Sequence, residues 1–162
     1  DRAMITKLAK PEVACEGKIL VLDDEKSLAE MLSEMLELFG YTTTVRHTPM
    51  EALALIEEQE FDLIISDFRM PGINGQQFYD LAIQKKPALA QRIIFVTGDL
   101  VNEETQKFLQ STGNPHLPKP FSLVQVKAAV AEVIQRNSTT EPGASAISLR
   151  SGDFPPGSGK RT

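Results

Sequence analysis

Short apolar runs alternate along the chain with stripes of apolar residues at helical spacing. The runs lie at residues 19–22, 63–65 and 93–96, and weaker strand signals at 41–46 and 116–118 bring the number of predicted strands to five. Between the first two strands, Leu28, Met31, Leu32, Met35, Leu36 and Phe39 recur every three or four positions. This alternation is typical of stacked βαβ units, so it predicts an α/β fold with a parallel sheet covered on both faces.

Capping signals place the ends of several helices. Gly40 occupies the position where a left-handed C-cap is expected, after the first apolar stripe. Thr48 and Glu51 form a capping box with proline at the first helical position, and Ser122 and Gln125 form another before the last helix. The fourth helix, at residues 102–110, offers few apolar anchors and is predicted to be weakly buried.

The two ends of the chain differ in composition from the central residues 17–136. Residues 1–16 are interpreted as a linker, and residues 137–162, rich in serine, glycine and proline, as a flexible tail. A first residue other than methionine favours a domain taken from a longer protein.

Composition narrows the class of protein. With 162 residues, 41% hydrophobic content and one cysteine, the chain can bury one core without disulfides or structural zinc. Cys15 is interpreted as a spare thiol in a reducing compartment. The net charge of -5 and the absence of a basic stripe argue against nucleic-acid binding by this chain. No apolar stretch approaches membrane-spanning length and no signal peptide is evident, so we expect a cytoplasmic location.

Polar residues follow four of the predicted strands and should meet at one edge of the sheet, where parallel α/β proteins bind ligands. Asp23 and Asp24 follow the first strand, and Asp67 follows the third. Clustered carboxylates repel one another, and Mg²⁺ is the usual counter-charge for such oxygen ligands. Asp24 and Asp67 are the candidate direct ligands, Asp23 is expected to act through water, and the Arg69 carbonyl to complete the shell.

Phosphoryl chemistry is the reaction that this set of residues favours. Asp67 is the candidate nucleophile that would form an aspartyl-phosphate. Lys119 would neutralise one phosphoryl oxygen, and the Thr97 hydroxyl would donate to another.

Four stretches hold these candidate residues: Leu22-Asp-Asp-Glu25, Ser66-Asp-Phe-Arg-Met-Pro-Gly-Ile-Asn-Gly75, Val96-Thr-Gly98 and Pro118-Lys-Pro-Phe121. Together they resemble the receiver domain of two-component response regulators. The resemblance implies a doubly wound, flavodoxin-like (βα)5 receiver at residues 17–136, with strand order 2-1-3-4-5. It implies a phosphoryl donor that is a histidine kinase or phosphotransfer domain, and a cis peptide between Lys119 and Pro120.

The same resemblance assigns roles to single residues. Asp67 corresponds to the phosphoacceptor, Asp23 and Asp24 to the acidic pair, Thr97 to the switch hydroxyl and Lys119 to the phosphate-binding lysine. His116 stands where the family usually has a rotating tyrosine or phenylalanine, and we interpret it as a half-buried histidine at the switch position. Arg69 stands where this family's side chains modulate access of the hydrolytic water, so it is expected to affect phosphate lifetime.

Three classes of function follow from these residues. In the first, phosphorylation switches the face formed by the fourth helix, the fifth strand and the last helix. The second, a haloacid-dehalogenase-like phosphatase, needs an acid two positions after the nucleophile, where Arg69 stands. The third is a phosphate-independent docking module, against which the intact acids and Lys119 count. An acidic cap on the first helix is a simpler interpretation of residues 23–25 and is compatible with all three.

Two alternatives remain for the protein to which this domain belongs. Residues 96–99 and 114–121 are similar to receivers at the carboxyl end of hybrid sensor histidine kinases, and a stand-alone regulator is the competitor. No kinase ATP lid, helix-turn-helix output or phosphorelay histidine is present, so the chain is expected to catalyse only its own phosphorylation and dephosphorylation. The polar helix at residues 102–110 favours a solvated face, with a receiver homodimer as the alternative.

Overall fold

Parallel strands and helices alternate through residues 16–98 and 102–139, the part of the chain that the computed structural model describes. Residues 1–15, with Cys15, residues 99–101 and the tail from residue 140 lie outside the described residues. The strands are β1 (Lys18–Leu22), β2 (Thr42–Arg46), β3 (Leu63–Asp67), β4 (Ile93–Thr97) and β5 (His116–Pro118). The helices are α2 (Lys26–Leu38), α3 (Pro49–Glu58), α4 (Gly75–Lys85), the 3-10 helix η1 (Pro87–Gln91), α5 (Glu103–Thr112) and α6 (Leu123–Thr139).

The sheet has the strand order β2-β1-β3-β4-β5, and every pairing is parallel. The chain runs outward from β1 to β2 and then crosses back to β3, so the direction of winding reverses between β1 and β3. Such a reversal opens a crevice at the carboxyl ends of the two strands. The predicted fold class and strand order are confirmed.

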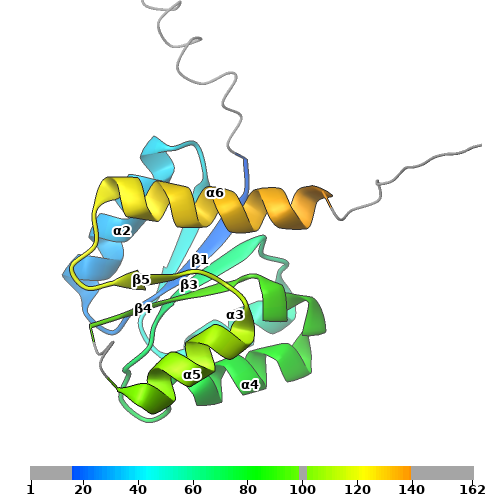
Figure 1. Ribbon diagram of the computed structural model, residues 1–162. Helices are drawn as coiled ribbons and strands as arrows, with labels where there is room; N and C mark the ends of the chain where they lie inside the picture. The colour runs from blue at the N-terminus through cyan, green and yellow to red at the C-terminus, as the bar shows by residue number, and fades with distance from the viewer. Residues whose placement is uncertain (1–15, 99–101, 140–162) are drawn as a thin grey trace, which may run out of the picture.

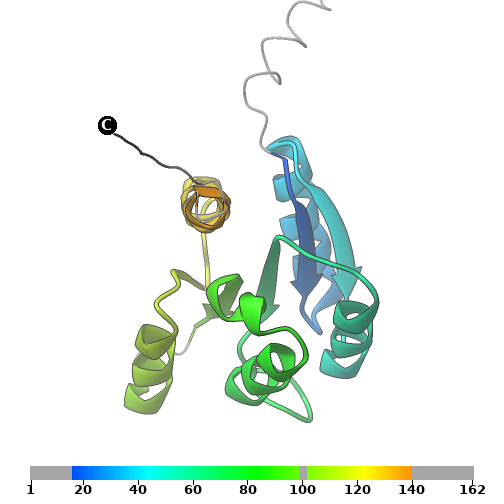
Figure 2. The same ribbon diagram turned by 90° about the vertical axis from the view of Figure 1, so that its right-hand side faces the viewer.

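Helices cover both faces of the sheet (Figures 1 and 2). Residues of one strand alternate between the two cores: Ile19 packs with α2 and α6, whereas Leu20 packs with α3, α4 and α5. The predicted stripe of α2 is buried at Leu32 and Leu36, but Met31 is 42% exposed. Among the described helices, none has the length and apolar character needed to cross a bilayer.

Local capping follows the sequence signals. Gly40 has a φ of 104°, as a left-handed position after α2 requires. The Thr48 hydroxyl accepts from the Glu51 N–H at 3.2 Å, so the predicted N-cap of α3 is confirmed. The Glu51 carboxylate accepts instead from the His47 N–H at 3.4 Å, one residue before the position that a reciprocal capping box would use. Asn74 and Gln77 form a reciprocal capping box before α4.

The last helix is longer than predicted. Asn137, assigned from composition to the tail, is a buried residue of α6. Its amide donates to the main-chain oxygens of Gln91 at 3.0 Å and Val133 at 2.8 Å. The predicted boundary at residue 137 is therefore wrong. It was set by composition, whereas the helix end is held by a contact with a distant segment.

An aromatic cluster next to the carboxyl end of β3 joins α5 to the sheet. Phe68, directly after β3, contacts Phe95 of β4 and Phe108 of α5, with ring centroids 5.4 and 5.9 Å apart. The Gly75 N–H donates to the Phe68 oxygen at 2.7 Å, and a Cβ at Gly75 would overlap the Phe68 ring. Glycine is therefore required where the loop after Asp67 closes over this ring.

Candidate functional site

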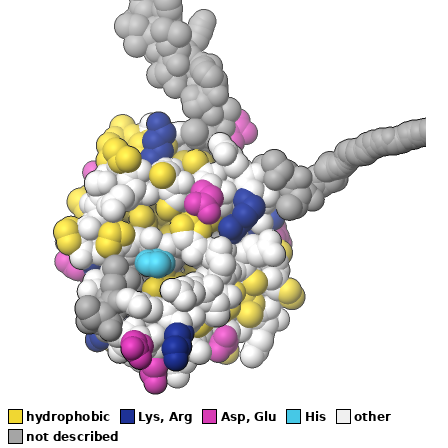
Figure 3. Space-filling view, viewed as in Figure 1, with side chains coloured by type: hydrophobic (Ala, Val, Ile, Leu, Met, Phe, Trp, Pro, Cys, Tyr) yellow, Lys and Arg dark blue, Asp and Glu magenta, His cyan; other side chains and the backbone are white. Residues whose placement is uncertain are grey.

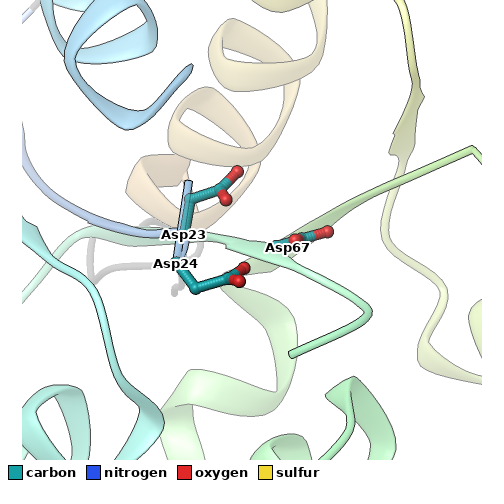
Figure 4. A group of neighbouring side chains, drawn as sticks. All are labelled: Asp23, Asp24 and Asp67. Carbon is teal, nitrogen blue, oxygen red and sulfur yellow. The ribbon is translucent and has the colours of Figure 1, made fainter. Parts of the chain in front are cut away.

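Three carboxylates converge at the carboxyl edge of the sheet (Figure 4). Asp23 and Asp24 directly follow β1, and Asp67 ends the neighbouring β3. One oxygen from each carboxylate lies within 4.8 Å of the others. Asp23 and Asp67 are 3% and 6% exposed, whereas Asp24 is open to solvent. The structure thus brings together the acids that the strand ends predicted to meet.

Burial perturbs the titration of the two inner acids. It raises the pKa of Asp23 to about 6, although the hydrogen bond from the Glu25 N–H opposes the rise and the charge of Asp67 adds to it. Burial also raises the pKa of Asp67 above its ordinary value, against the opposing effect of the Lys119 ammonium. Both groups therefore resist carrying negative charge unless a cation compensates them.

Lys119 supplies a positive charge to Asp67. It follows β5, and its Nζ lies 3.2 Å from Asp67 Oδ1. The Lys119 N–H donates to the Thr97 oxygen at 3.1 Å, which extends the pairing of β4 and β5 by one residue. The Lys119–Pro120 peptide is cis, as the resemblance implied.

Thr97 and Arg69 lie beside Asp67 in different ways. Thr97 is buried and ends β4, one residue beyond Val96, the partner of Asp67. Arg69 is exposed, and its backbone forms a hydrogen bond with the Asp67 carboxylate that lowers the pKa of this acid. The main chain of Arg69 therefore contacts the site directly.

His116 differs from the expected half-buried histidine. It is exposed at the start of β5, where it pairs with Phe95. β5 is a three-residue strand at the edge of the described sheet, where it pairs with β4, and it turns the next residue, Leu117, into the core. The side chain before Leu117 is therefore left at the surface.

Two residues that contact the main chain of these acids were not predicted from the sequence. Ser66 is fully buried, and its hydroxyl donates to the main-chain oxygen of Asp67 at 2.9 Å. His47, directly after β2, lies with Nδ1 3.0 Å from the main-chain oxygen of Asp23. The available signal for His47 was its place after a parallel strand, because all carboxyl strand ends meet at this edge.

A doubly wound sheet with clustered acids and a lysine at its carboxyl edge defines the receiver class of signalling domains. A family model for the response regulator receiver domain matches residues 19–131, well over half of the chain. The chain therefore belongs to the response regulator receiver domain family, as its four motifs predicted.

Relatives agree with this assignment. The DNA-binding response regulator MtrA of Mycobacterium tuberculosis is 31% identical over 120 residues, covering 74% of this chain and 51% of MtrA. The transcriptional regulatory protein CpxR of Klebsiella pneumoniae is 27% identical over 147 residues, covering 87% of this chain and 62% of CpxR. The chain thus spans between about half and three-fifths of these curated relatives.

Solved structures show the same architecture. The receiver domain of the Francisella response regulator 1452 is 30% identical with a TM-score of 0.66, over 75% of this chain and 98% of that one. The receiver domain of the hybrid histidine kinase CckA is 28% identical with a TM-score of 0.61, over 74% of this chain and all of the other.

Proposed function

We propose that this receiver accepts a phosphoryl group on Asp67 from a phosphohistidine of a histidine kinase or phosphotransfer domain. The observation that carries the proposal is the Asp67 carboxylate, which is buried among acids and lies 3.2 Å from the Lys119 ammonium. An Asp67 oxygen forms the new bond to phosphorus, and the bond from phosphorus to the imidazole nitrogen of the donor breaks. The released imidazole takes its proton from solvent.

Two side chains are proposed to balance charge on the transferred group. The Lys119 ammonium neutralises one phosphoryl oxygen, as its contact with Asp67 supports. The buried Thr97 hydroxyl donates to a second oxygen, and its place at the end of β4 next to Asp67 supports this role. Both residues stand at the ends of the adjacent strands β4 and β5, so the fold already holds these donors on the edge where Asp67 lies.

The residues present suit Mg²⁺. Carboxylate oxygens are the hard ligands that this cation prefers, and three of them lie within 4.8 Å of one another. We propose that Asp24 and Asp67 hold the ion directly, Asp23 through water, and the Arg69 carbonyl from the loop. When bound, Mg²⁺ supplies positive charge that offsets the acids and the phosphoryl oxygens.

Binding of Mg²⁺ is expected to weaken in acid. A carboxylate must lose its proton to support a cation, and the pKa of Asp23 is raised to about 6. Affinity therefore rises with pH through this value and levels off above it. At pH 5, roughly a tenth of Asp23 is ionised, so we expect about tenfold weaker binding than at pH 7.5. Calorimetric titration at the two pH values measures this, and equal affinities would contradict it.

We propose that phosphorylation switches the surface of α5, β5 and α6, with Thr97 and His116 at the switch positions. Thr97 pairs with Pro118 and Phe95 with His116, so a shift of β4 at the phosphate reaches β5 directly. The exposed His116 has room to reorient. On the side of the molecule seen in Figure 3, charges of both signs are interspersed with hydrophobic groups, which suits a contact surface for a partner or second receiver.

The receiver is proposed to work in the cytoplasm, within a hybrid sensor kinase or a stand-alone regulator. The CckA receiver supports the first parent, and the similarity to MtrA supports the second. The full reading frame decides between them.

Small phosphodonors test the proposed function. Incubation with acetyl phosphate and Mg²⁺ should add one phosphoryl group, detected by intact mass, that alkali removes and a chelator prevents. Failure to form either this adduct or a beryllofluoride complex would contradict the proposal and favour the docking-module alternative.

A further inference from the structure

The last residue of β2 and the first residue of the turn that follows bind the two main-chain polar groups of Asp23. The Asp23 N–H donates to the Arg46 oxygen at 3.2 Å. The Asp23 oxygen lies 3.0 Å from Nδ1 of His47, the first residue after β2. Because a carbonyl oxygen can only accept, Nδ1 carries the hydrogen and donates it. Two successive residues, Arg46 and His47, thus bind the main-chain N–H and C=O of Asp23.

The His47 imidazole makes its hydrogen bond just beyond the last paired residues of β1 and β2. Strands β1 and β2 pair from Lys18 with Thr42 to Leu22 with Arg46. Asp23 lies one residue beyond this ladder and is 3% exposed, so its carbonyl oxygen needs a partner from a side chain or water. His47 provides that partner. The Asp23 carboxylate is held separately, since its Oδ1 accepts from the Glu25 N–H at 2.9 Å.

We propose that His47 is a positioning residue for the metal-binding acids, an inference that rests on the proposed function. The Asp23 carbonyl belongs to the peptide that joins Asp23 to Asp24. A hydrogen bond to this oxygen fixes the peptide plane and with it the direction in which both side chains leave the loop. His47 thereby orients two carboxylates toward Asp67 without touching the phosphoryl group. Partners that orient metal ligands in this way commonly change affinity when they are removed.

Other hydrogen bonds hold the turn between β2 and α3. The effect of removing the imidazole on the site can therefore be measured separately from an effect on the fold. The His47 N–H donates to Glu51 Oε1 at 3.4 Å, and the Glu51 N–H donates to the Thr48 hydroxyl at 3.2 Å. These bonds use the backbone of His47 and the cap of α3, not the imidazole. Removing the imidazole leaves them in place.

Four proteins test the proposal by calorimetric titration with Mg²⁺: the wild type, His47→Ala, His47→Asn and Thr48→Ala. His47→Ala should weaken Mg²⁺ binding about tenfold. His47→Asn should stay within about threefold of the wild type, because its amide nitrogen can occupy the place of Nδ1. Thr48→Ala removes the α3 cap, so it should lower the melting temperature and leave Mg²⁺ affinity unchanged.

Amide hydrogen exchange at Asp23, whose N–H donates to the Arg46 oxygen, provides a second readout when it is measured without metal. It should be faster in His47→Ala than in the wild type and near normal in His47→Asn. Unchanged exchange and affinity in His47→Ala, or an equal loss of affinity in Thr48→Ala, would overturn the positioning role. A wild-type protein that binds no Mg²⁺ would contradict the proposed function instead, and the exchange rates would still decide the role of His47.

Discussion

Asp67→Asn is expected to abolish phosphoryl uptake. The amide cannot replace the carboxylate as nucleophile, and neither Asp23 nor Asp24 is paired with Lys119 as Asp67 is. Intact mass after incubation with acetyl phosphate and Mg²⁺ should show no adduct in this variant. Asp80→Asn, a change of the same charge at an exposed position of α4, should be labelled like the wild type. A labelled Asp67→Asn protein would place the acceptor elsewhere.

The same substitution is expected to stabilise the metal-free fold at neutral pH. Burial raises the pKa of Asp67 above its ordinary value of 3.8, so ionisation costs more in the folded chain than in the unfolded chain. The cost begins near the unfolded pKa and is complete above the folded pKa. Asparagine removes it, so we expect the free energy of unfolding to rise at pH 7. Below the ordinary pKa both forms are neutral, so the gain should disappear there.

Urea unfolding with a chelator present, at pH 7 and at pH 3, measures this difference. The Asp80→Asn control should show no gain at pH 7, because Asp80 is exposed. A loss of stability in Asp67→Asn at neutral pH would mean that the contact with Lys119 outweighs the cost of burying the carboxylate.

Lys119→Ala is expected to change metal binding and phosphoryl uptake in opposite directions. The ammonium lies 3.2 Å from Asp67 Oδ1, where it would stabilise a transferred phosphoryl group but repel a cation. Its removal should slow uptake from acetyl phosphate by about 100-fold, the typical loss for one charge-stabilising donor. Mg²⁺ binding should tighten by about fivefold, because the competing positive charge is gone.

Rates by intact mass and affinities by calorimetry test both effects. Lys127→Ala is the matched control, since its Nζ lies over the Phe39 ring, 5.5 Å from the centroid, and carries the same charge elsewhere. It should alter neither quantity by more than about twofold. Parallel losses of affinity and rate in Lys119→Ala would contradict the proposed role and indicate general damage to the site.

The placement of the acids was predictable because it depends on topology alone. Any polar residue that ends a parallel strand reaches the same edge, so Asp23, Asp24 and Asp67 had to meet once the strands were assigned. Their roles as ligands and nucleophile remain predictions.

Contacts set by loop and helix geometry could not be predicted in the same way. The bond from His47 to the Asp23 oxygen depends on how two turns approach each other, and no local pattern encodes it. Asn137 was assigned to the tail because its neighbours are polar, but its amide is held by Gln91, 46 positions away. The exposure of His116 follows from the short edge strand, whose orientation one sequence does not specify.

The position of the phosphoryl group tests the central claim most directly. Borohydride reduction of the phosphorylated protein converts an aspartyl-phosphate to homoserine, and peptide mass mapping then locates the changed residue. The account predicts homoserine at position 67 and at no other aspartate. Homoserine at position 23 or 24, or a phosphoryl group that resists reduction and lies on histidine, would contradict it.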